Sequence, residues 1–197
     1  MWALIFFGTI GGLTIATWLG NKLVKPVSVV AARRQLAKGP PQLVDGAVVT
    51  LTGTVKPIDL LTAPISRRSC VALHVKAFIG PTWLTRFAMT RFVLQTDQGD
   101  VFVEHFPDAA LALPILKLQP PYDVAEQFLR GIGRMPWEAG KARFEEMVIE
   151  PGDRIAVFGV VRTELEVPEA GEIGFRDSKQ VVRLTGDPRH PMALGEP

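Results

Sequence analysis

The chain has 197 residues, of which 47% are hydrophobic and 21% are charged. This length suits one domain with a substantial core, and the composition is that of a globular rather than a disordered protein. A formal net charge of +2 is too small for a protein that wraps along duplex nucleic acid. The single cysteine excludes an intramolecular disulfide framework and any zinc site built from several cysteines.

The N-terminal stretch, residues 1–21, contains no ionisable side chain and is apolar or small apart from three threonines and a final asparagine. About 20 helical residues span the ~30 Å hydrocarbon layer of a bilayer. Trp2 and Trp18 lie near the two ends, where indoles prefer the headgroup level. A cleaved signal peptide is the alternative, but no Lys or Arg precedes the apolar run and no A-x-A site follows it. We therefore predict a transmembrane helix over residues 1–21.

A basic juxtamembrane connector is predicted over residues 22–45. Its basic residues, with no acid before Asp45, are Lys22, Lys25, Arg33, Arg34 and Lys38. Positive charge beside a span tends to stay cytoplasmic, which predicts a single-pass protein whose C-terminal domain lies on the cytoplasmic side. A short helix is expected between Ser28 and Gly39, and it either lies on anionic lipid or is a solvated connector.

From Gly46 onward, apolar and polar residues alternate, which is typical of half-buried strands. The predicted strands are 46–56, 69–79, 91–96, 101–106, 154–164 and 181–186. Gly53 interrupts the first strand, as glycines do at a bend or a close backbone approach. In the second strand, alternation places Cys70, His74 and Lys76 on the face opposite Val71, Leu73, Val75 and Ala77.

Turn residues connect several of these strands. Asp97-Gln98-Gly99-Asp100 predicts a hairpin between the third and fourth strands. Glu150-Pro151-Gly152-Asp153 fits a type II turn before the fifth. Residues 107–150 form a proline-rich insertion, packed on the barrel or the membrane, with a short helix at 125–133 and a segment, 135–149, that is ambiguous between helix and strand.

The fold class that follows is mainly β. Several short strands with glycine kinks and one partly helical insertion favour a small closed barrel, with an OB-like barrel preferred. The expected barrel domain covers residues 46–186, and residues 187–197 are expected to form a tail.

Several motifs recur in a characteristic order. Residues 61–71 contain a loop motif made of Ala63, Pro64, Ser66, Arg68 and Cys70. The motifs after it contribute Asp97 and Gly99, then Pro151, Gly152 and Asp153, and finally Gly159. In this order they resemble the GIDE domain, also called the BAM or "beside a membrane" domain, over residues 46–186. These motif residues are either structural or partner-binding.

The resemblance implies a membrane domain without ligase activity. In eukaryotes, GIDE domains occur in ubiquitin ligases of mitochondria and chloroplasts, between two membrane helices and followed by a RING zinc domain. Here the residues after Gly186 are too few for a second span, and no Cys/His array could make a RING. The chain is similar to stand-alone prokaryotic relatives, which implies a non-catalytic sensing or protein-binding module. The eukaryotic domain faces away from the cytosol, which conflicts with the cytoplasmic side that the positive charges of the connector predict.

Cys70 is the one candidate nucleophile that the loop motif offers. His74 lies four residues along the same predicted strand, or ~13 Å away, which is too far for a hydrogen bond. His105 or His190 would therefore have to supply the base by tertiary contact. A buried thiol at the start of a strand is the favoured alternative. We predict no catalytic residue, no cofactor and, from the histidine spacing, no metal.

Ser66 and Arg68 each carry two interpretations. Ser66 is expected to bond nearby backbone in the turn, since no nucleophile-elbow sequence surrounds it. Arg68 either pairs with an internal acid such as Asp97 or Asp153, which we favour, or binds an anion or a partner carboxylate.

An aromatic and basic segment, Gly80 to Phe92, is expected to be a loop. Trp83, Arg86 and Phe87 either enter the membrane interface or, for the two aromatic residues, fill the end of the barrel. The possible membrane contacts are thus Lys22, Lys25, Arg33, Arg34, Trp83, Arg86 and Phe87.

Three functions compete at this stage. A membrane-anchored barrel that binds a protein partner or lipid is the leading hypothesis. Single-stranded nucleic-acid binding by an OB-like face is the second, opposed by the near-neutral charge and the predicted anchor. An enzyme that uses Cys70 is the third, and no constellation supports it.

Overall fold

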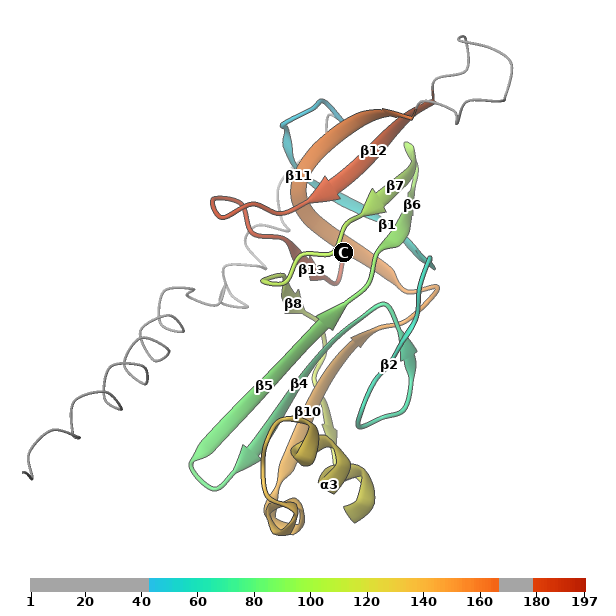
Figure 1. The fold of residues 1–197 in the computed structure, drawn as a ribbon. Coiled ribbons are helices and arrows are strands. Elements are labelled where there is room, and N and C mark those ends of the chain that lie inside the picture. The colour runs from blue at the N-terminus through green and yellow to red at the C-terminus, as the bar shows by residue number, and fades with distance from the viewer. Residues whose placement is uncertain (1–42, 167–178) are drawn as a thin grey trace, which may run out of the picture.

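The computed structural model describes residues 43–166 and 179–197, and this part of the chain is mainly β (Figure 1). The predicted transmembrane helix and most of the basic connector lie outside the described residues. Among the described residues, none of the helices has the length and apolar character that crossing a bilayer requires.

The first half of the domain contains β1 (Val48–Pro57), β2 (Leu61–Thr62), β3 (Ser69–Cys70), β4 (Ala72–Ile79), β5 (Thr82–Met89), β6 (Phe92–Thr96) and β7 (Gly99–Val103). The second half contains β8 (Ala110–Ala112), β9 (Leu116–Leu118), helix α3 (Tyr122–Gly131), the 3₁₀ helix η1 (Pro136–Lys141), β10 (Arg143–Ile149), β11 (Arg154–Glu166), β12 (Lys179–Thr185) and β13 (Ala193–Gly195).

Five strands close into a barrel in the order β1-β6-β7-β12-β11, with β11 pairing back to β1. All neighbours are antiparallel except β7 and β12, which run parallel. Numbered along the chain, the order is therefore 1-2-3-5-4, and it returns to the first strand. A closed barrel removes the free edges that an open sheet would expose. This arrangement is compatible with the OB-like barrel expected from the sequence.

Two glycines allow the barrel strands to approach closely. A Cβ atom at Gly53 would lie 2.4 Å from the backbone oxygen of Gln95, and one at Gly159 would lie 2.7 Å from that of Thr185. No residue with a side chain fits at these distances, so glycine is required where the strands cross. The close backbone approach expected at Gly53 is confirmed.

The C-terminal residues belong to the folded domain rather than to a free tail. Strand β13 pairs with β11 on one side and, in parallel, with β8 on the other. Met192, Ala193 and Leu194 are fully buried. The domain therefore extends beyond the boundary expected at Gly186, because the pairing partners of β13 are distant in sequence.

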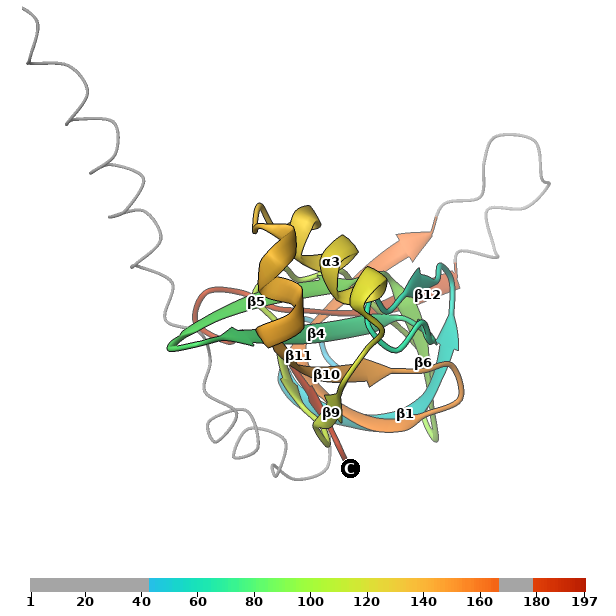
Figure 2. The ribbon, with the colours of Figure 1, turned by 90° about the horizontal axis from the view of Figure 1, so that it is seen from below.

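A second sheet, with the order β5-β4-β10-β9, extends from the barrel (Figures 1 and 2). Its strands come from two insertions, one between β1 and β6 and one between β7 and β11. Helix α3 covers one face of this sheet through Phe128, whose ring meets that of Phe144 edge-to-face with centroids 5.8 Å apart. The molecule thus has one hydrophobic core inside the barrel and another beneath α3.

The segment from Gly80 to Phe92 is a strand and not the loop expected from the sequence. Residues 82–89 form β5, which pairs with β4 along its whole length. The connection is a two-residue turn, Gly80-Pro81, in which Gly80 has the positive φ of +58° that primed hairpin turns require. The prediction failed because both faces of β5 mix polar and apolar residues, which hides the period of two.

The expected second strand is broken at Val71, between β3 and β4. Cys70 packs with Leu73 and Val75 in the core beneath α3, while Val71 enters the barrel core. The predicted alternation, which grouped Cys70 with His74, is therefore wrong. After the bend at Val71, odd-numbered residues such as Leu73 continue on the face that Cys70 occupies, because a one-residue shift moves side chains to the opposite face of a strand.

The predictions of two turns and of one short helix agree with the structure. The hairpin around Gly99 and the turn at Gly152 are confirmed, with positive φ values of +114° and +88°. The predicted short helix is α3, which begins three residues earlier, at Tyr122. The ambiguous segment divides into η1 and β10.

Candidate functional site

The loop motif between β2 and β3 is folded around one buried carboxylate. Glu146 of β10 is completely buried, and its two oxygens accept the backbone N–H groups of Ile65 at 3.2 Å and Ser66 at 3.1 Å. A buried carboxylate is tolerated when backbone donors satisfy it. Glu146 therefore holds the loop against the second sheet.

The loop also closes on itself. The backbone N–H of Ala63 donates to the carbonyl of Arg68 at 2.8 Å, and that of Arg67 donates to the carbonyl of Ala63 at 3.0 Å. Arg67 has a φ of +61°, a left-handed conformation that is strained for a residue with a side chain. The hydroxyl of Ser66 accepts a long hydrogen bond from the backbone N–H of Arg68 at 3.5 Å, as expected for a serine that bonds local backbone.

Arg68 forms an ion pair within the fold, as favoured, but with a different acid from those proposed. Its Nη1 lies 2.8 Å from Oε1 of Glu150. Asp153 instead accepts the backbone N–H of Glu150 at 2.8 Å and so organises the turn, while Asp97 lies in the β6–β7 hairpin. Glu150 was missed because only the fold of this turn brings it opposite the loop.

Cys70 is fully buried at the end of β3. Burial, followed by the nearby carboxylates of Glu146 and Glu150, raises the pKa of the thiol to about 11. The thiol is therefore protonated at neutral pH, the opposite of what a nucleophile requires. The expected burial of the thiol is confirmed, although Cys70 ends the short strand β3 and does not begin a long strand. His74 belongs to the other face of the sheet, where burial and Lys76 lower its pKa.

The structure brings together only part of the motif. Ala63, Pro64, Ser66, Arg68 and Cys70 lie against Glu146 and the turn formed by Pro151, Gly152 and Asp153. Asp97 and Gly99 lie in the β6–β7 hairpin, and Gly159 lies against β12. Each of these residues has a structural environment, and together they do not line one cleft.

The outer face of the barrel carries a compact charge network. Arg183 of β12 pairs with Glu104 and, at 2.9 Å, with Glu164, and its guanidinium lies 5.8 Å from the centre of the Phe102 ring. The hydrogen bond to Glu104 is the main cause that raises the pKa of Arg183. The aromatic ring and the cation on this face are thus already engaged with groups of the protein itself.

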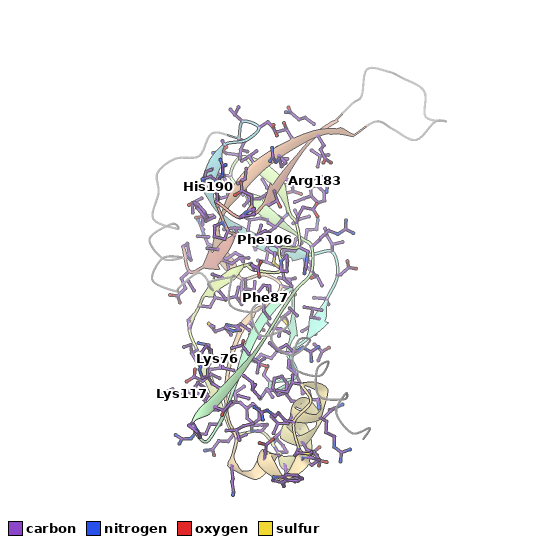
Figure 3. All side chains as sticks on the ribbon, turned by 60° about the vertical axis from the view of Figure 1, so that its left-hand side comes forward. Lys76, Phe87, Phe106, Lys117, Arg183 and His190 are labelled. Carbon is purple, nitrogen blue, oxygen red and sulfur yellow. The ribbon has the colours of Figure 1, made fainter. Side chains whose placement is uncertain are left out.

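The open face of the second sheet, on the side away from α3, differs in character. Cross-strand register places Arg143, Phe78 and Trp83 in one row, and Lys117, Glu145 and Lys76 in the next. We call these six residues the distal surface. Figure 3 shows Lys76 and Lys117 near each other on the second sheet, well apart from Arg183 on the barrel.

The cations of the distal surface have no partner in the described part of the chain. The ion pairs found there, at N···O distances up to 4.0 Å, involve none of Lys76, Lys117 and Arg143. Trp83 is 60% exposed, and Trp137 in the neighbouring η1 is 69% exposed. Phe87, by contrast, packs against the barrel core, so the two aromatic residues grouped by the sequence have different roles.

A cleft of about 680 Å³ opens at this end of the second sheet. It is lined by Phe78, Leu118 and Phe144, with Lys117 and Arg143 beside them. Phe78 and the two cations belong to the open face of the sheet, while the side chains of Leu118 and Phe144 pack in the core beneath α3. The cleft thus combines apolar walls with two cations, and Glu145 is the acid that lines it. We take this cleft as the candidate binding site.

Sequence reasoning missed most of this surface. Lys117 and Arg143 belong to the insertion, where no motif marked them, and they meet only through the pairing of β9 with β10. Trp137, in a short PWE sequence outside any apolar period, was the one signal available. Glu146 opens the sequence motif that ends in Pro151, Gly152 and Asp153, but its role in holding a loop about 80 positions away has no local signal.

In residues 43–166 and 179–197, no three His, Cys, Asp or Glu side chains come together as metal ligands. Comparison of the chain with family models, with curated proteins and with solved structures found no match.

Proposed function

We propose that the protein is a membrane-anchored, non-catalytic binding module, in which an OB-like barrel is the scaffold and the second sheet is the binding part. The observation that carries this proposal is the combination of unpaired cations, a cleft and an exposed indole on one face of the second sheet. The cations of the distal surface form no ion pair within 4.0 Å and lie on the face that carries the exposed Trp83, whereas Arg183 and Phe102 on the barrel are engaged with each other and with two glutamates. Groups left unsatisfied by the fold are those available to a partner.

The membrane anchor in this proposal is supported by the sequence of residues 1–21, and the basic connector supports a cytoplasmic domain. The resemblance to GIDE domains fits a domain held beside a membrane, without ligase activity of its own. The strand order 1-2-3-5-4 supports the OB-like description of the barrel.

Single-stranded nucleic acid is disfavoured as the ligand of the barrel. OB-fold proteins stack bases on exposed aromatic residues of the second and third strands, here β6 and β7. The aromatic residue at this place is Phe102, which faces Arg183, and two glutamates flank that arginine. Arg162 lies opposite Arg183, so the two arginines balance the two glutamates and this surface offers phosphates no net attraction.

Site-specific photo-crosslinking in intact cells tests the proposed function. A photo-reactive residue would replace Trp83 on the distal surface or, as a control, the exposed Gln95 on the barrel. We expect adducts, with lipid or with protein, from position 83 and none from position 95. Adducts from the barrel alone would overturn the assignment of the second sheet.

Membrane attachment is tested separately. Alkaline extraction should leave the full chain in the membrane fraction, and a reporter fused after Pro197 should be active on the cytoplasmic side. Release by alkali would remove the anchor from the proposal, and a reporter active on the other side would reverse the topology.

A further inference from the structure

The cleft at the distal end has the chemistry of a site for an amphipathic anion. Lys117 and Arg143 line it with no acid within ion-pair distance, so both remain available to a ligand. A guanidinium binds phosphate oxygens through two parallel hydrogen bonds, and an ammonium adds a point charge beside it. Together with Lys76 and against Glu145, the cations leave this face with a net positive charge.

The apolar walls indicate that the anion is attached to an apolar group. Phe78 is half-buried on the same face as the two cations, between Arg143 and the exposed Trp83 in one cross-strand row, while Phe144 and Leu118 close the floor of the cleft from the core beneath α3. A free inorganic anion would gain nothing from these side chains. A phospholipid would place its phosphate on the cations and its glycerol and upper acyl carbons on the apolar walls.

Exposed aromatic residues flank the cleft at the end of the molecule. Trp83 follows the β4–β5 turn, and Trp137 belongs to η1, which leads into β10 beside the cleft. The β4–β5 turn and η1 both lie at the end of the second sheet remote from the barrel (Figures 1 and 2). Indoles prefer the interfacial layer of a membrane, and Met135, 54% exposed, adds an apolar side chain next to η1.

We propose that the distal cleft binds the phosphate headgroup of an anionic phospholipid, with Trp83 and Trp137 in the interfacial layer. The inference rests on the proposed function and names the ligand of its binding surface. A protein partner fits less well, because the most exposed indoles stand on two separate projections beside a basic cleft. A flat layer of phosphates can meet both projections and the cleft at once.

Tryptophan quenching in nanodiscs tests this inference on the full chain. The sequence contains four tryptophans, so Trp2→Phe and Trp18→Phe leave Trp83 and Trp137 as the only reporters. The protein is placed in discs of brominated phosphatidylcholine, with or without phosphatidylglycerol. We expect quenching in the anionic discs, little quenching in the neutral ones, and loss of quenching at high salt.

Charge reversal tests the role of the cleft. In the same background, Lys117→Glu with Arg143→Glu should shift the docked-to-undocked ratio by at least ~25-fold, because each basic residue at an anionic surface contributes about fivefold. Lys56→Glu with Arg91→Glu makes the same change in net charge on exposed barrel residues and should leave quenching nearly unchanged. Lys117→Gln with Arg143→Gln should have an intermediate effect on quenching. These neutral variants are less prone to misfold than the charge reversals, and circular dichroism checks that every variant is folded.

The outcomes are distinguishable. Reporters that stay unquenched in anionic discs, while the chain remains embedded, overturn the lipid site and leave the proposed function intact. Quenching that does not depend on phosphatidylglycerol, or that persists after the charge reversal at Lys117 and Arg143, also overturns the proposed headgroup site. A chain that does not enter discs overturns the anchor. Co-flotation of that chain with phosphatidylglycerol vesicles, and its loss on the same reversal, then decides the lipid site alone.

Discussion

The barrel and the second sheet differ in their edges and in the surroundings of their aromatic and basic side chains. In the barrel every strand has two neighbours, and Arg183 on its outer face is engaged with two glutamates and an aromatic ring. In the second sheet β5 is an edge strand of eight residues, and Lys117 and Arg143 lie unpaired beside an open cleft. The closed barrel therefore serves as the stable scaffold, while the second sheet combines free edges with unpaired cations at a cleft that a ligand can enter.

The junction of the two regions depends most on Glu146. Replacing Glu146 with Ala removes both acceptors of the Ile65 and Ser66 N–H groups, and we expect the free energy of unfolding to fall by ~4 kcal/mol. Glu146→Gln keeps one oxygen and should cost about half as much. Urea denaturation of the detergent-solubilised protein measures both. An unchanged midpoint for Glu146→Ala would show that the loop does not need its carboxylate.

Barrel closure depends on Gly53. Gly53→Ala places a methyl group 2.4 Å from a backbone oxygen of β6 and should lower the free energy of unfolding by ~3 kcal/mol, since strands must separate to admit it. Gly131→Ala, at the end of α3 with no atom within 4 Å of the new Cβ, is the matched control. It should be neutral or stabilising by up to ~1 kcal/mol. Equal effects at the two positions would contradict the barrel geometry.

The buried thiol predicts a pH-dependent difference between the wild type and Cys70→Ala. Because the pKa of Cys70 rises from 9.0 to about 11 on folding, the unfolded chain loses its thiol proton first as pH rises. The stability from the protonated thiol is complete below pH 9 and is lost between pH 9 and 11, by ~3 kcal/mol. Unfolding free energies measured across this range should show the loss in the wild type only. Rapid alkylation of folded protein at neutral pH would argue against the raised pKa.

The charge contrast itself is tested by paired substitutions. Arg183→Met leaves Glu104 and Glu164 without their partner and should cost ~1 kcal/mol of stability, a value reduced by partial exposure. Lys117→Met with Arg143→Met should change stability by less than ~0.5 kcal/mol, because no internal partner is lost. Thermal unfolding compares the two. A larger loss from the distal pair would mean that its cations serve the fold.

The smallest effect is expected for the ion pair of the loop motif. Arg68 and Glu150 are 52% and 37% exposed, and such pairs contribute ~0.5 kcal/mol. A double-mutant cycle with Arg68→Gln and Glu150→Gln measures the coupling. A coupling free energy several times larger would contradict the small contribution that the exposure of Arg68 and Glu150 predicts.

Local signals in the sequence predicted the elements that depend on neighbours along the chain. The period of two in β1 and the turn residues around Gly99 and Gly152 were sufficient for those elements. Strands β8, β9 and β13 are three residues long, and their partners are remote, so no local period announces them. The bend at Val71 shows the same limit, since tertiary packing sets which face Cys70 occupies.

The candidate site was predictable only in part. The sequence marks Trp83 as an aromatic residue beside basic ones, although it predicts a loop where the structure has strand β5. Lys117 and Arg143 lie 26 positions apart and become neighbours through strand register alone. Glu146 accepts hydrogen bonds from the backbone of Ile65 and Ser66, which lie 81 and 80 positions away along the chain. Such long-range pairings are set by topology, which the local pattern does not contain.

Hydrogen exchange of the full chain in bilayers tests most directly the claim that the second sheet, and not the barrel, is the binding region. Amide exchange would be compared between phosphatidylcholine discs and discs that also contain phosphatidylglycerol. Anionic lipid should slow exchange in residues 80–86 and 134–143 and leave exchange in the barrel strands β6 and β7 unchanged. Protection centred on β6 and β7, with the distal end unaffected, would contradict it.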